Sequence, residues 1–504
     1  MAIFTPVISW FTRRRLHQIE LFLKYPHDVQ RDLLMNLLSA AKNTEYGQLY
    51  NFESIHSVEE FQQRVPLNSY DTLKPYIDRL RKGEQQLLWN SDIQWFSKSS
   101  GTTAGKSKFI PVSLESLEEC HYKGGKDMFA LYLNNYPDSN LFDGRALAMG
   151  GSHHIADSGK DIFFGDVSAI LIQNLPFWAE FLRVPSLDIA LMDKWEEKIE
   201  KMAHATANKN VTNIAGVPSW TLLLLKRILE ITSKKDISEV WPNLEVFFHG
   251  GVSFTPYRKQ FKALISSPKM NYVETYNASE GFFGIQDTID GDDMLLMLDY
   301  GIFYEFIPLE NIHDEHPKAL TLEQVELDKN YAIVITTNAG LWRYMIGDTV
   351  RFTSLSPYRI KISGRTKTFI NAFGEELIED NAIKALAIAC EKTNSEVLDF
   401  TAAPIYLDEG KHARHQWLIE FAKPPEDLQY FSEVLDNALK AQNSDYEAKR
   451  YHDLMLILPE IIAVPKKTFY KWLKQSGKLG GQHKVPRLSN DRRIADEILE
   501  IIQV

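Results

Sequence analysis

The sequence predicts an α/β protein with a large N-terminal domain and a smaller α+β C-terminal domain, on three observations. A chain of 504 residues is too long to fold around one hydrophobic core. Short apolar runs typical of strands alternate with amphipathic helical patterns through the first two thirds of the chain. A stretch bounded by Gly364 and Gly374 then precedes a compact succession of helices and strands. We therefore expect domains at 1–365 and 375–504, joined by a hinge at 366–374.

The larger domain is predicted to begin with helices. Leucine and isoleucine recur at helical spacing over residues 14–46, and Pro26 divides this segment into two helices. Ile93 and Trp95 alternate with polar residues, which predicts a half-buried strand at this point. Further helical patterns cover 58–63, 70–81, 114–135, 191–207 and 219–233, and strand patterns cover 244–248, 331–337 and 358–362.

The smaller domain is predicted to alternate helices with strands and to end in a basic tail. Between Val464 and Arg493 there are nine lysines and arginines and one acidic residue, although the whole chain has a net charge of -11. Such a segment indicates either a negatively charged partner or a solvated helix face. The predicted helices are 377–392 and 427–440, and the predicted strands are 396–405, 415–422 and 454–458.

Composition and charge exclude several classes of protein. The acidic balance argues against an extended nucleic-acid surface. No apolar stretch approaches the length of a membrane span, and the basic run Arg13–Arg15 follows the first apolar run instead of preceding it, unlike a secretory signal. Cys120 and Cys390 are far apart, so we expect two reduced, buried thiols and no structural zinc. We expect a cytoplasmic protein without membrane or nucleic-acid partners, a monomer or a weak dimer.

A loop rich in serine, threonine, glycine and lysine lies between apolar flanks within residues 95–113. Hydroxyls, ammonium groups and closely approaching backbone N–H groups suit a polyphosphate. The loop is not a Walker motif, because only three residues separate Gly101 from Gly105. Ser113 is expected to cap a helix that begins at Leu114. On these residues alone, a flexible surface loop and a phosphate-binding loop both remain open.

Two glycine-flanked motifs follow further along the chain. Gly250 and Gly251 come after a strand, where they form either a plain turn or a surface on which a flat ligand lies against the backbone. Tyr276, Ser279 and Glu280 bring an aromatic ring, a hydroxyl and a carboxylate within five residues. They suit a stacked base, a phosphate and Mg²⁺, respectively, or else form a polar turn with a core tyrosine.

Two further motifs carry charge. Asp348 follows a glycine at an expected strand end, where a carboxylate can accept hydrogen bonds from both ribose hydroxyls. The alternative is an aspartate that caps a helix or forms a turn. Arg365, after Gly364, could reach the same ribose or a phosphate, or pair with a surface carboxylate.

The order of these motifs resembles that of the adenylate-forming superfamily. The residues within these motifs are most similar to those of one branch, the auxin-responsive-promoter family of acyl-acid amido synthetases. The chain looks like a bacterial-type member of that family. The resemblance runs from the N-terminal helices to Arg487. It rests on Ser-Ser-Gly-Thr-Thr, Tyr-x-x-Ser-Glu, Tyr-Met-Ile-Gly-Asp-Thr-Val and Gln-His-Lys-Val-Pro-Arg. It implies an N-terminal domain of β-sheets flanked by helices with a distorted β-barrel, and a mobile C-terminal domain.

The resemblance also implies roles for individual residues. Asp348 and Arg365 would hold the ribose, and Glu280 would bind Mg²⁺ and serve catalysis. Lys484 would be the mobile lysine that enters for adenylation, although Lys478, in a Ser-Gly-Lys sequence, is the alternative. The remaining ATP- and AMP-binding residues would be Ser99, Ser100, Gly101, Thr102, Thr103, Gly250, Gly251, Tyr276 and Ser279.

The function implied is an ATP- and Mg²⁺-dependent ligase. It would convert a carboxylic acid to an acyl-adenylate with release of pyrophosphate, and then transfer the acyl group to the amine of an amino acid with release of AMP. Two alternatives stay open. One is an acyl-CoA ligase that shares the adenylation step, and the other is a nucleotide-binding protein without catalysis.

Overall fold

The computed structural model divides the chain into two compact units, which we describe separately. The first contains residues up to Ser99 and Phe109–Thr366, and the second contains Lys367–Val504. The division follows the first residue of the expected hinge, whose function stays a prediction. The description covers all residues except 1–3, 100–107, 152, 156–161, 176, 193, 252–253, 255–256, 313, 367–368, 376, 407–412, 454, 477–484 and 504.

Several helices of the first unit begin where the sequence supplies a cap or a proline. Pro26 occupies the first turn of α2, and the hydroxyls of Ser57 and Ser113 accept backbone N–H groups at the starts of α4 and α6. A π-helical segment, Leu117–Tyr122, joins α6 to α7. The helices are α1 (Phe4–Lys24), α2 (Pro26–Ala41), α3 (Glu45–Leu49), α4 (Val58–Arg64), α5 (Tyr70–Leu80), α6 (Leu114–Ser116), α7 (Lys123–Asn135), α8 (Val167–Gln173), α9 (Leu187–Ala190), α10 (Trp195–Thr206), α11 (Pro218–Thr232), α12 (Ile237–Val240) and α13 (Arg258–Leu264).

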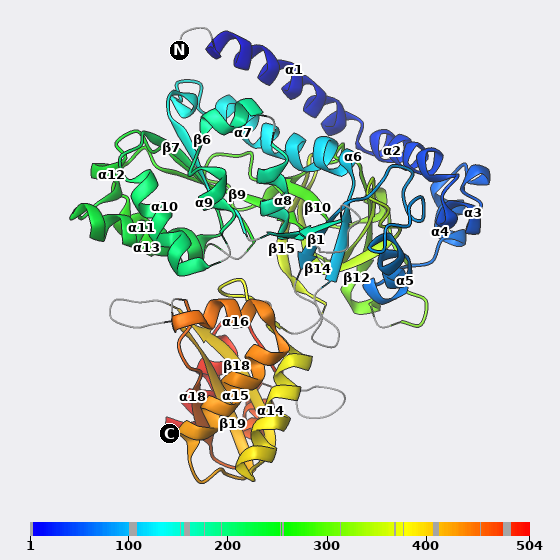
Figure 1. Cartoon of the computed structure of the whole chain (residues 1–504). Coiled ribbons are helices and arrows are strands. Elements are labelled where there is room, and N and C mark those ends of the chain that lie inside the picture. Colours follow the sequence, from blue (N-terminus) through cyan, green and yellow to red (C-terminus); the bar gives the residue numbers. More distant parts are fainter. Residues whose placement is uncertain are drawn as a thin grey trace. The chain divides into compact units, whose positions relative to one another are not determined.

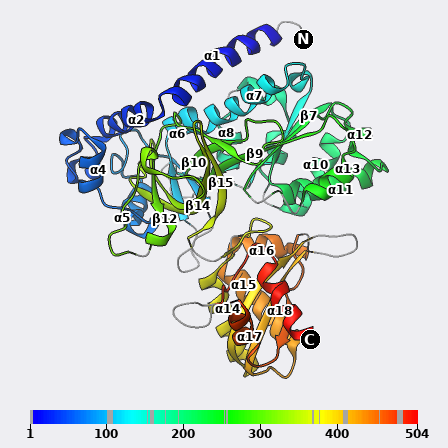
Figure 2. The same ribbon diagram turned by 180° about the vertical axis from the view of Figure 1, so that it is seen from behind.

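An eleven-stranded mixed sheet forms the centre of the first unit. Its order is β12-β13-β14-β15-β11-β10-β9-β8-β7-β3-β6. The strands are β3 (Arg145–Ala148), β6 (Arg183–Val184), β7 (Val211–Gly216), β8 (Val246–His249), β9 (Asn271–Ala278), β10 (Gly281–Ile285), β11 (Met294–Leu296), β12 (Ile302–Pro308), β13 (Asn330–Thr337), β14 (Tyr344–Leu355) and β15 (Tyr358–Arg365). In Figures 1 and 2, α10 to α13 gather beside its parallel strands, whereas α1, α2 and α7 run together along a different side of the unit.

The two halves of this sheet meet at β9. This strand pairs parallel with β8 and antiparallel with β10, so the parallel strands β6 to β9 continue directly into the antiparallel ones. Strands four places apart on a flat sheet lie about 19 Å from each other. Yet a side chain of β9 hydrogen-bonds one of β14, four places away. The antiparallel half is therefore strongly curled, which agrees with the expected distorted barrel.

A second, four-stranded sheet of the first unit carries the flanks of the Ser/Thr loop. Its order is β2-β1-β5-β4, and β1 pairs parallel with β5. The strands are β1 (Trp95–Ser99), β2 (Lys108–Val112), β4 (His153–Ile155) and β5 (Phe163–Gly165). The strand predicted before the loop and the helix cap predicted after it, at Ser113, are both confirmed.

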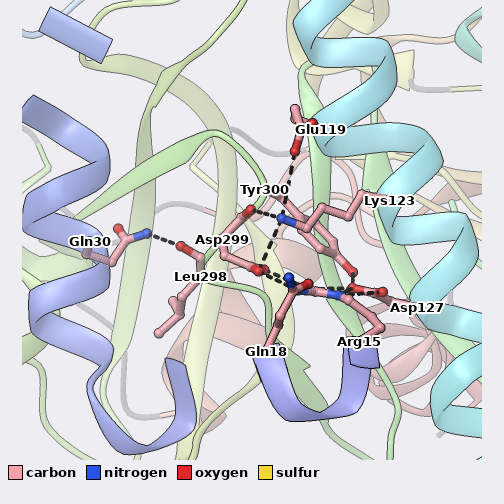
Figure 3. A network of polar contacts seen from close by, with 9 residues as sticks. All are labelled: Arg15, Gln18, Gln30, Glu119, Lys123, Asp127, Leu298, Asp299 and Tyr300. Atoms are coloured by element: carbon pink, nitrogen blue, oxygen red, sulfur yellow. Dashed lines mark hydrogen bonds and ion pairs between the residues drawn. The ribbon is translucent and has the colours of Figure 1, made fainter. Parts of the chain in front are cut away.

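A buried polar network fastens α1 and α2 to the unit (Figure 3). The guanidinium of Arg15 donates to Asp127 on α7 (Nε to Oδ1, 2.7 Å) and to Asp299 (Nη1 to Oδ2, 2.6 Å). Tyr300 donates to the same Asp127 carboxylate at 2.6 Å. On α2, the amide of Gln30 donates to the carbonyl of Leu298 at 2.8 Å. Each charge in this network has a partner of opposite sign, so the loss of one partner would leave a buried charge uncompensated.

The second unit is a three-stranded sheet between two pairs of helices (Figures 1 and 2). Strand β18 pairs antiparallel with β19, and β19 pairs parallel with β20. Phe469 and Trp472 of one helix pair pack against Ala403 and Leu418 of the sheet. The elements are β16 (Phe369–Ile370), β17 (Leu377–Ile378), α14 (Glu379–Thr393), β18 (Glu396–Ile405), β19 (Arg414–Lys423), α15 (Leu428–Gln442), α16 (Ser444–Arg450), β20 (Glu460–Val464), α17 (Thr468–Gln475) and α18 (Arg493–Gln503).

Two predictions for the second unit are wrong. The strand expected at 454–458 forms instead at Glu460–Val464, after Pro459. Leu456 is buried, but its N–H donates to Lys449 O and its carbonyl accepts from Arg450, so its backbone makes no strand ladder. Cys390 is half-buried rather than buried, whereas Cys120 is buried as expected.

The described basic residues of the tail are of two kinds: some are exposed to solvent, and others are paired with carboxylates. Lys471 and Lys474 are exposed on α17, opposite buried Trp472, as expected of a solvated helix face. Arg487 and Arg492 instead form ion pairs with Asp399 and Asp496. Lys466, Lys467 and Arg493 are exposed as well. The two remaining basic residues, Lys478 and Lys484, lie outside the described residues.

Candidate active site

The Ser/Thr loop itself lies mostly outside the described residues. Ser100, Gly101, Thr102 and Thr103 are not described, and of Ser99 the structure describes the backbone at the end of β1. Lys478 and Lys484 also lie outside. The geometry that follows therefore concerns the other candidate residues, all of which belong to the first unit.

Three candidate residues that are distant in the sequence meet at one carboxylate. Arg365 on β15 lies directly opposite Asp348 on β14, and its Nε donates to Asp348 Oδ1 at 2.6 Å. The hydroxyl of Tyr276 on β9 donates to Asp348 Oδ2 at 2.7 Å. Each oxygen of the carboxylate thus has one charged or polar donor, and the carboxylate is held in a single orientation.

Burial determines the protonation state of Tyr276. Only 4% of Tyr276 is exposed, and its ring packs against Phe283 with centroids 4.8 Å apart. Burial, followed by the negative charge of Asp348, raises the pKa of Tyr276 well above its usual value. The phenol therefore keeps its proton and acts only as a donor to Asp348.

The position of Asp348 differs from the expectation. It lies inside β14, a strand of twelve residues, and not at a strand end, in a turn or at a helix cap. The preceding Gly347 has a φ of +94°, and the pairing of β14 with β15 shifts register after Thr349. In a regular strand, side chains alternate between the two faces of the sheet. The irregularity here changes the direction of the Asp348 side chain, so that its carboxylate faces Arg365 and Tyr276.

Ser279 and Glu280 form the tight turn between β9 and β10. Ser279 accepts a hydrogen bond from the hydroxyl of Ser97 on β1 at 2.8 Å. This bond joins the turn to the strand that leads into the Ser/Thr loop. Glu280 is half-buried beside Tyr276 and Tyr344, whose pKa values its charge helps to raise. The turn therefore lies close to Tyr276, which donates to the Asp348 carboxylate.

Glu280 offers a carboxylate of the type that binds magnesium together with a nucleotide. No group of three or more histidines, cysteines or carboxylates that could hold a metal occurs among the described residues. Mg²⁺ in nucleotide sites is typically bound by one or two carboxylates together with phosphate oxygens and water. A single half-buried carboxylate such as Glu280 suits that arrangement and would not bind the ion tightly without the nucleotide.

The two glycines after β8 lie against β9. A Cβ on Gly250 would come within 2.4 Å of the carbonyl oxygen of Thr275, the residue before Tyr276. Gly251 has a φ of +80°, which side-chain-bearing residues rarely adopt. Both positions therefore require glycine for backbone reasons, and they place the end of β8 beside the strand that carries Tyr276.

His249, just before these glycines, was not among the predicted site residues. Its ring is 2% exposed and stacks on Phe254 with centroids 4.0 Å apart. Neither ring nitrogen has a hydrogen-bond partner among the described residues. Burial, followed by the charge of Arg258, lowers the pKa of His249 to about 3, so the imidazole is neutral at physiological pH.

This buried imidazole predicts a loss of stability in mild acid. An unfolded histidine titrates near pH 6.5, so between pH 6.5 and 3 the unfolded state binds more protons than the folded one. The free energy of unfolding should fall by about 2 kcal/mol between pH 7 and pH 5 because of this group. Urea unfolding of the wild type and of His249→Phe at both pH values checks it: the variant should lose that difference, and an unchanged difference would contradict the prediction.

Residues that position the site were also missed by sequence reasoning. Ser97, a buried serine on β1, contacts Ser279 without resembling a site residue itself. Arg343 is a buried arginine that precedes β14, the strand of Asp348, and it binds Glu305. For Arg343 the only sequence clue was its place within the stretch that ends at Asp348.

Comparison with known proteins identifies the family. The GH3 family N-terminal domain matches residues 15–270, its central domain residues 295–365 and its C-terminal domain residues 380–493. The indole-3-acetic acid-amido synthetase GH3.4 of Arabidopsis thaliana is 24% identical over 96% of this chain and 92% of its own length. The jasmonoyl–L-amino acid synthetase GH3.5 of Oryza sativa subsp. japonica is 26% identical over 97% and 96%.

Solved structures show the same fold. AtGH3.15 acyl acid amido synthetase in complex with 2,4-DB aligns with a TM-score of 0.63 and 18% identity, covering 97% of this chain and 96% of that one. A 2-hydroxyisobutyryl-CoA ligase aligns with a TM-score of 0.57 and 12% identity, covering 94% and 91%. The α/β architecture with a smaller C-terminal unit is thereby confirmed. Because all three domain models match in order along the chain, this protein belongs to the GH3 family, as the resemblance of its motifs implied.

Proposed function

We propose that this protein is an acyl-acid amido synthetase that adenylates a carboxylic acid with ATP and transfers the acyl group to the amine of an amino acid. The observation that carries the proposal is the Tyr276–Asp348–Arg365 group, set in a chain that matches the GH3 family throughout. An oriented carboxylate backed by an arginine suits the two hydroxyls of a ribose.

The chemistry has two steps. A carboxylate oxygen of the acid attacks the α-phosphorus of ATP, and the bond to the β-phosphate oxygen breaks, so that pyrophosphate leaves with the electron pair. The amine then attacks the acyl carbon of the adenylate, loses a proton and expels AMP. Charge develops on phosphate oxygens in the first step, where fixed donors and cations are most effective.

The proposed roles of the residues follow this division. Asp348 and Arg365 hold the ribose, and Ser279 contacts the α-phosphate. Glu280 holds Mg²⁺, which when bound neutralises phosphate charge. The backbone at Gly250 and Gly251 would lie along the adenine, and Tyr276, whose ring is buried, would contribute to nucleotide binding by orienting Asp348. Hydroxyls and N–H groups of the Ser/Thr loop would bind the β- and γ-phosphates through Ser99, Ser100, Gly101, Thr102 and Thr103.

Further features of the enzyme stay proposals with this function. We propose cytoplasmic action, which suits two free cysteines. No helix among the described residues has the length and apolar character to cross a membrane. We propose a monomer or weak dimer without nucleic-acid partners. Two steps with different geometry suit a C-terminal domain that moves about residues 366–374 between them.

The test of the proposal is ATP–pyrophosphate exchange over a panel of carboxylic acids, followed by mass analysis of products formed with mixed amino acids. We expect acid-dependent exchange and an amide product. Products formed only with coenzyme A would favour an acyl-CoA ligase. ATP binding without exchange for any acid would favour a nucleotide-binding protein without catalysis. Membership of the GH3 family, whose curated relatives are named as amido synthetases, favours the amide.

Tyr276→Phe should weaken ATP binding selectively. The variant keeps the ring but removes the donor to Asp348, and a hydrogen bond to a charged group contributes about 1.5–3 kcal/mol. We expect the KM for ATP in the exchange assay to rise about tenfold or more, with the KM for the acid unchanged. Tyr304→Phe is the matched control, because that buried hydroxyl has no partner among the described residues. Equal effects of both variants would contradict the prediction.

A further inference from the structure

We infer that Ser97 is a positioning residue for the adenylation step, because it fixes the hydroxyl of Ser279 as a hydrogen-bond donor toward the nucleotide. The inference rests on the proposed function. It adds a residue to which none of the motifs points, and it assigns a proton direction to one that they contain.

A hydrogen bond joins the two serines. Ser97 is fully buried on β1, in register with Gly165 of β5. Its hydroxyl donates to Ser279 Oγ at 2.8 Å. The two residues are 182 positions apart: Ser97 belongs to the four-stranded sheet, and Ser279 to the turn between two strands of the eleven-stranded sheet. The bond therefore ties the four-stranded sheet, at the root of the Ser/Thr loop, to the β9–β10 turn.

The hydrogen bond from Ser97 determines what the hydroxyl of Ser279 can still do. A serine hydroxyl has one proton to donate and two lone pairs that accept. Since Ser279 accepts from Ser97, its own proton points elsewhere, and accepting a bond strengthens its donation. Ser279 is half-buried, so this proton can reach a ligand. The matching group is an acceptor without protons, and an anionic phosphate oxygen is the one that ATP supplies.

The turn that carries Ser279 also carries a competing acceptor. Glu280, the next residue, carries a carboxylate whose charge reaches Tyr276. A Ser279 side chain that rotated freely could donate to such an acceptor instead of to the phosphate. The hydrogen bond from Ser97 fixes the Ser279 side chain in one orientation, so that the hydroxyl proton of Ser279 stays available to the ligand. Ser97 thus acts through Ser279 and needs no contact with the substrate.

A double-mutant cycle tests this inference with the full chain. Ser97→Ala, Ser279→Ala and the double variant are compared with the wild type in ATP–pyrophosphate exchange. We expect Ser97→Ala to lower kcat/KM for ATP about tenfold with the KM for the acid unchanged. With Ser279 already replaced by Ala, the same change should have less than about a twofold effect. An equal factor in both backgrounds would overturn the inference, since a purely structural serine affects both alike.

Two controls separate the possible failures. Ser432→Ala removes another buried serine hydroxyl, one that donates to Pro459 O at 2.5 Å in the second unit, and should leave exchange unchanged. If the wild type shows no exchange with any acid, the proposed function fails. The same four proteins are then compared in calorimetric binding of AMP. A Ser97 effect on the Kd that disappears in the Ser279→Ala background supports the inference, and one that persists overturns it.

Discussion

Lys484→Ala should lower ATP–pyrophosphate exchange by about 10²–10³-fold while the fold is retained. Loss of one preorganised donor that stabilises developing charge typically has an effect of this size. The described part of the second unit gives a reason to look between residues 477 and 484. Lys466, Lys467, Lys471, Lys474 and Arg493 are exposed to solvent, and Arg487 and Arg492 have carboxylate partners. The two remaining basic residues of the tail are Lys478 and Lys484.

The same experiment distinguishes the two lysine candidates. Lys478→Ala is the matched control, because it removes the same charge from the same segment. We expect it to retain exchange within about threefold of the wild type, as is usual away from the reacting groups. Amide formation from a supplied acyl-adenylate should survive in Lys484→Ala, since the lysine serves the first step. Wild-type exchange in that variant, or loss in Lys478→Ala instead, would contradict the assignment.

Arg343→Ala should be the most destabilising single change in the first unit among those considered, by about 3–5 kcal/mol. The Arg343 side chain is 6% exposed and that of Glu305 is 1% exposed. Nε and Nη2 of Arg343 donate to the two carboxylate oxygens at 2.9 and 2.8 Å, and Nη1 donates to the carbonyl of Val65 at 2.7 Å. Removal of the arginine leaves a buried carboxylate without its counter-charge.

Urea unfolding followed by tryptophan fluorescence measures this effect, because Trp342 adjoins Arg343 and is fully buried. Arg351→Ala is a control on β14, the strand that begins directly after Arg343, since its ion pair with Asp328 is exposed and 3.9 Å long. It should change the free energy of unfolding by at most about 1 kcal/mol. Combining Arg343→Met with Glu305→Leu should restore most of the loss, because no charge then stays buried. A double variant as unstable as Arg343→Ala would show that the lost arginine contacts, not the stranded charge, dominate.

Local sequence patterns were sufficient to predict helices that have one buried face or a clear capping residue. Pro26, Ser113 and the apolar spacing of α14 and α15 predicted their helices because capping and amphipathic periodicity depend on neighbours in sequence. The same logic failed for β9 and β14. These strands carry the polar residues of the candidate site, which interrupt the alternation that marks a half-buried strand.

The error at 454–458 has a related cause. Met455 and Leu456 are apolar because they are buried, and burial alone does not make a strand. Ladder pairing with β19 begins only at Glu460, beyond Pro459, where backbone groups are free to bond. A short apolar run therefore predicts a buried segment more securely than it predicts the backbone conformation.

Residue type and motif order were enough to predict the family, the α/β class and the identity of the candidate residues, because such motifs depend on local chemistry and spacing. The meeting of Tyr276, Asp348 and Arg365 at one carboxylate needed the tertiary structure, since it depends on the curl of a sheet whose strands come from distant parts of the chain. The same holds for Ser97 and Arg343. Their types are ordinary, and only long-range packing brings one to Ser279 and the other to Glu305.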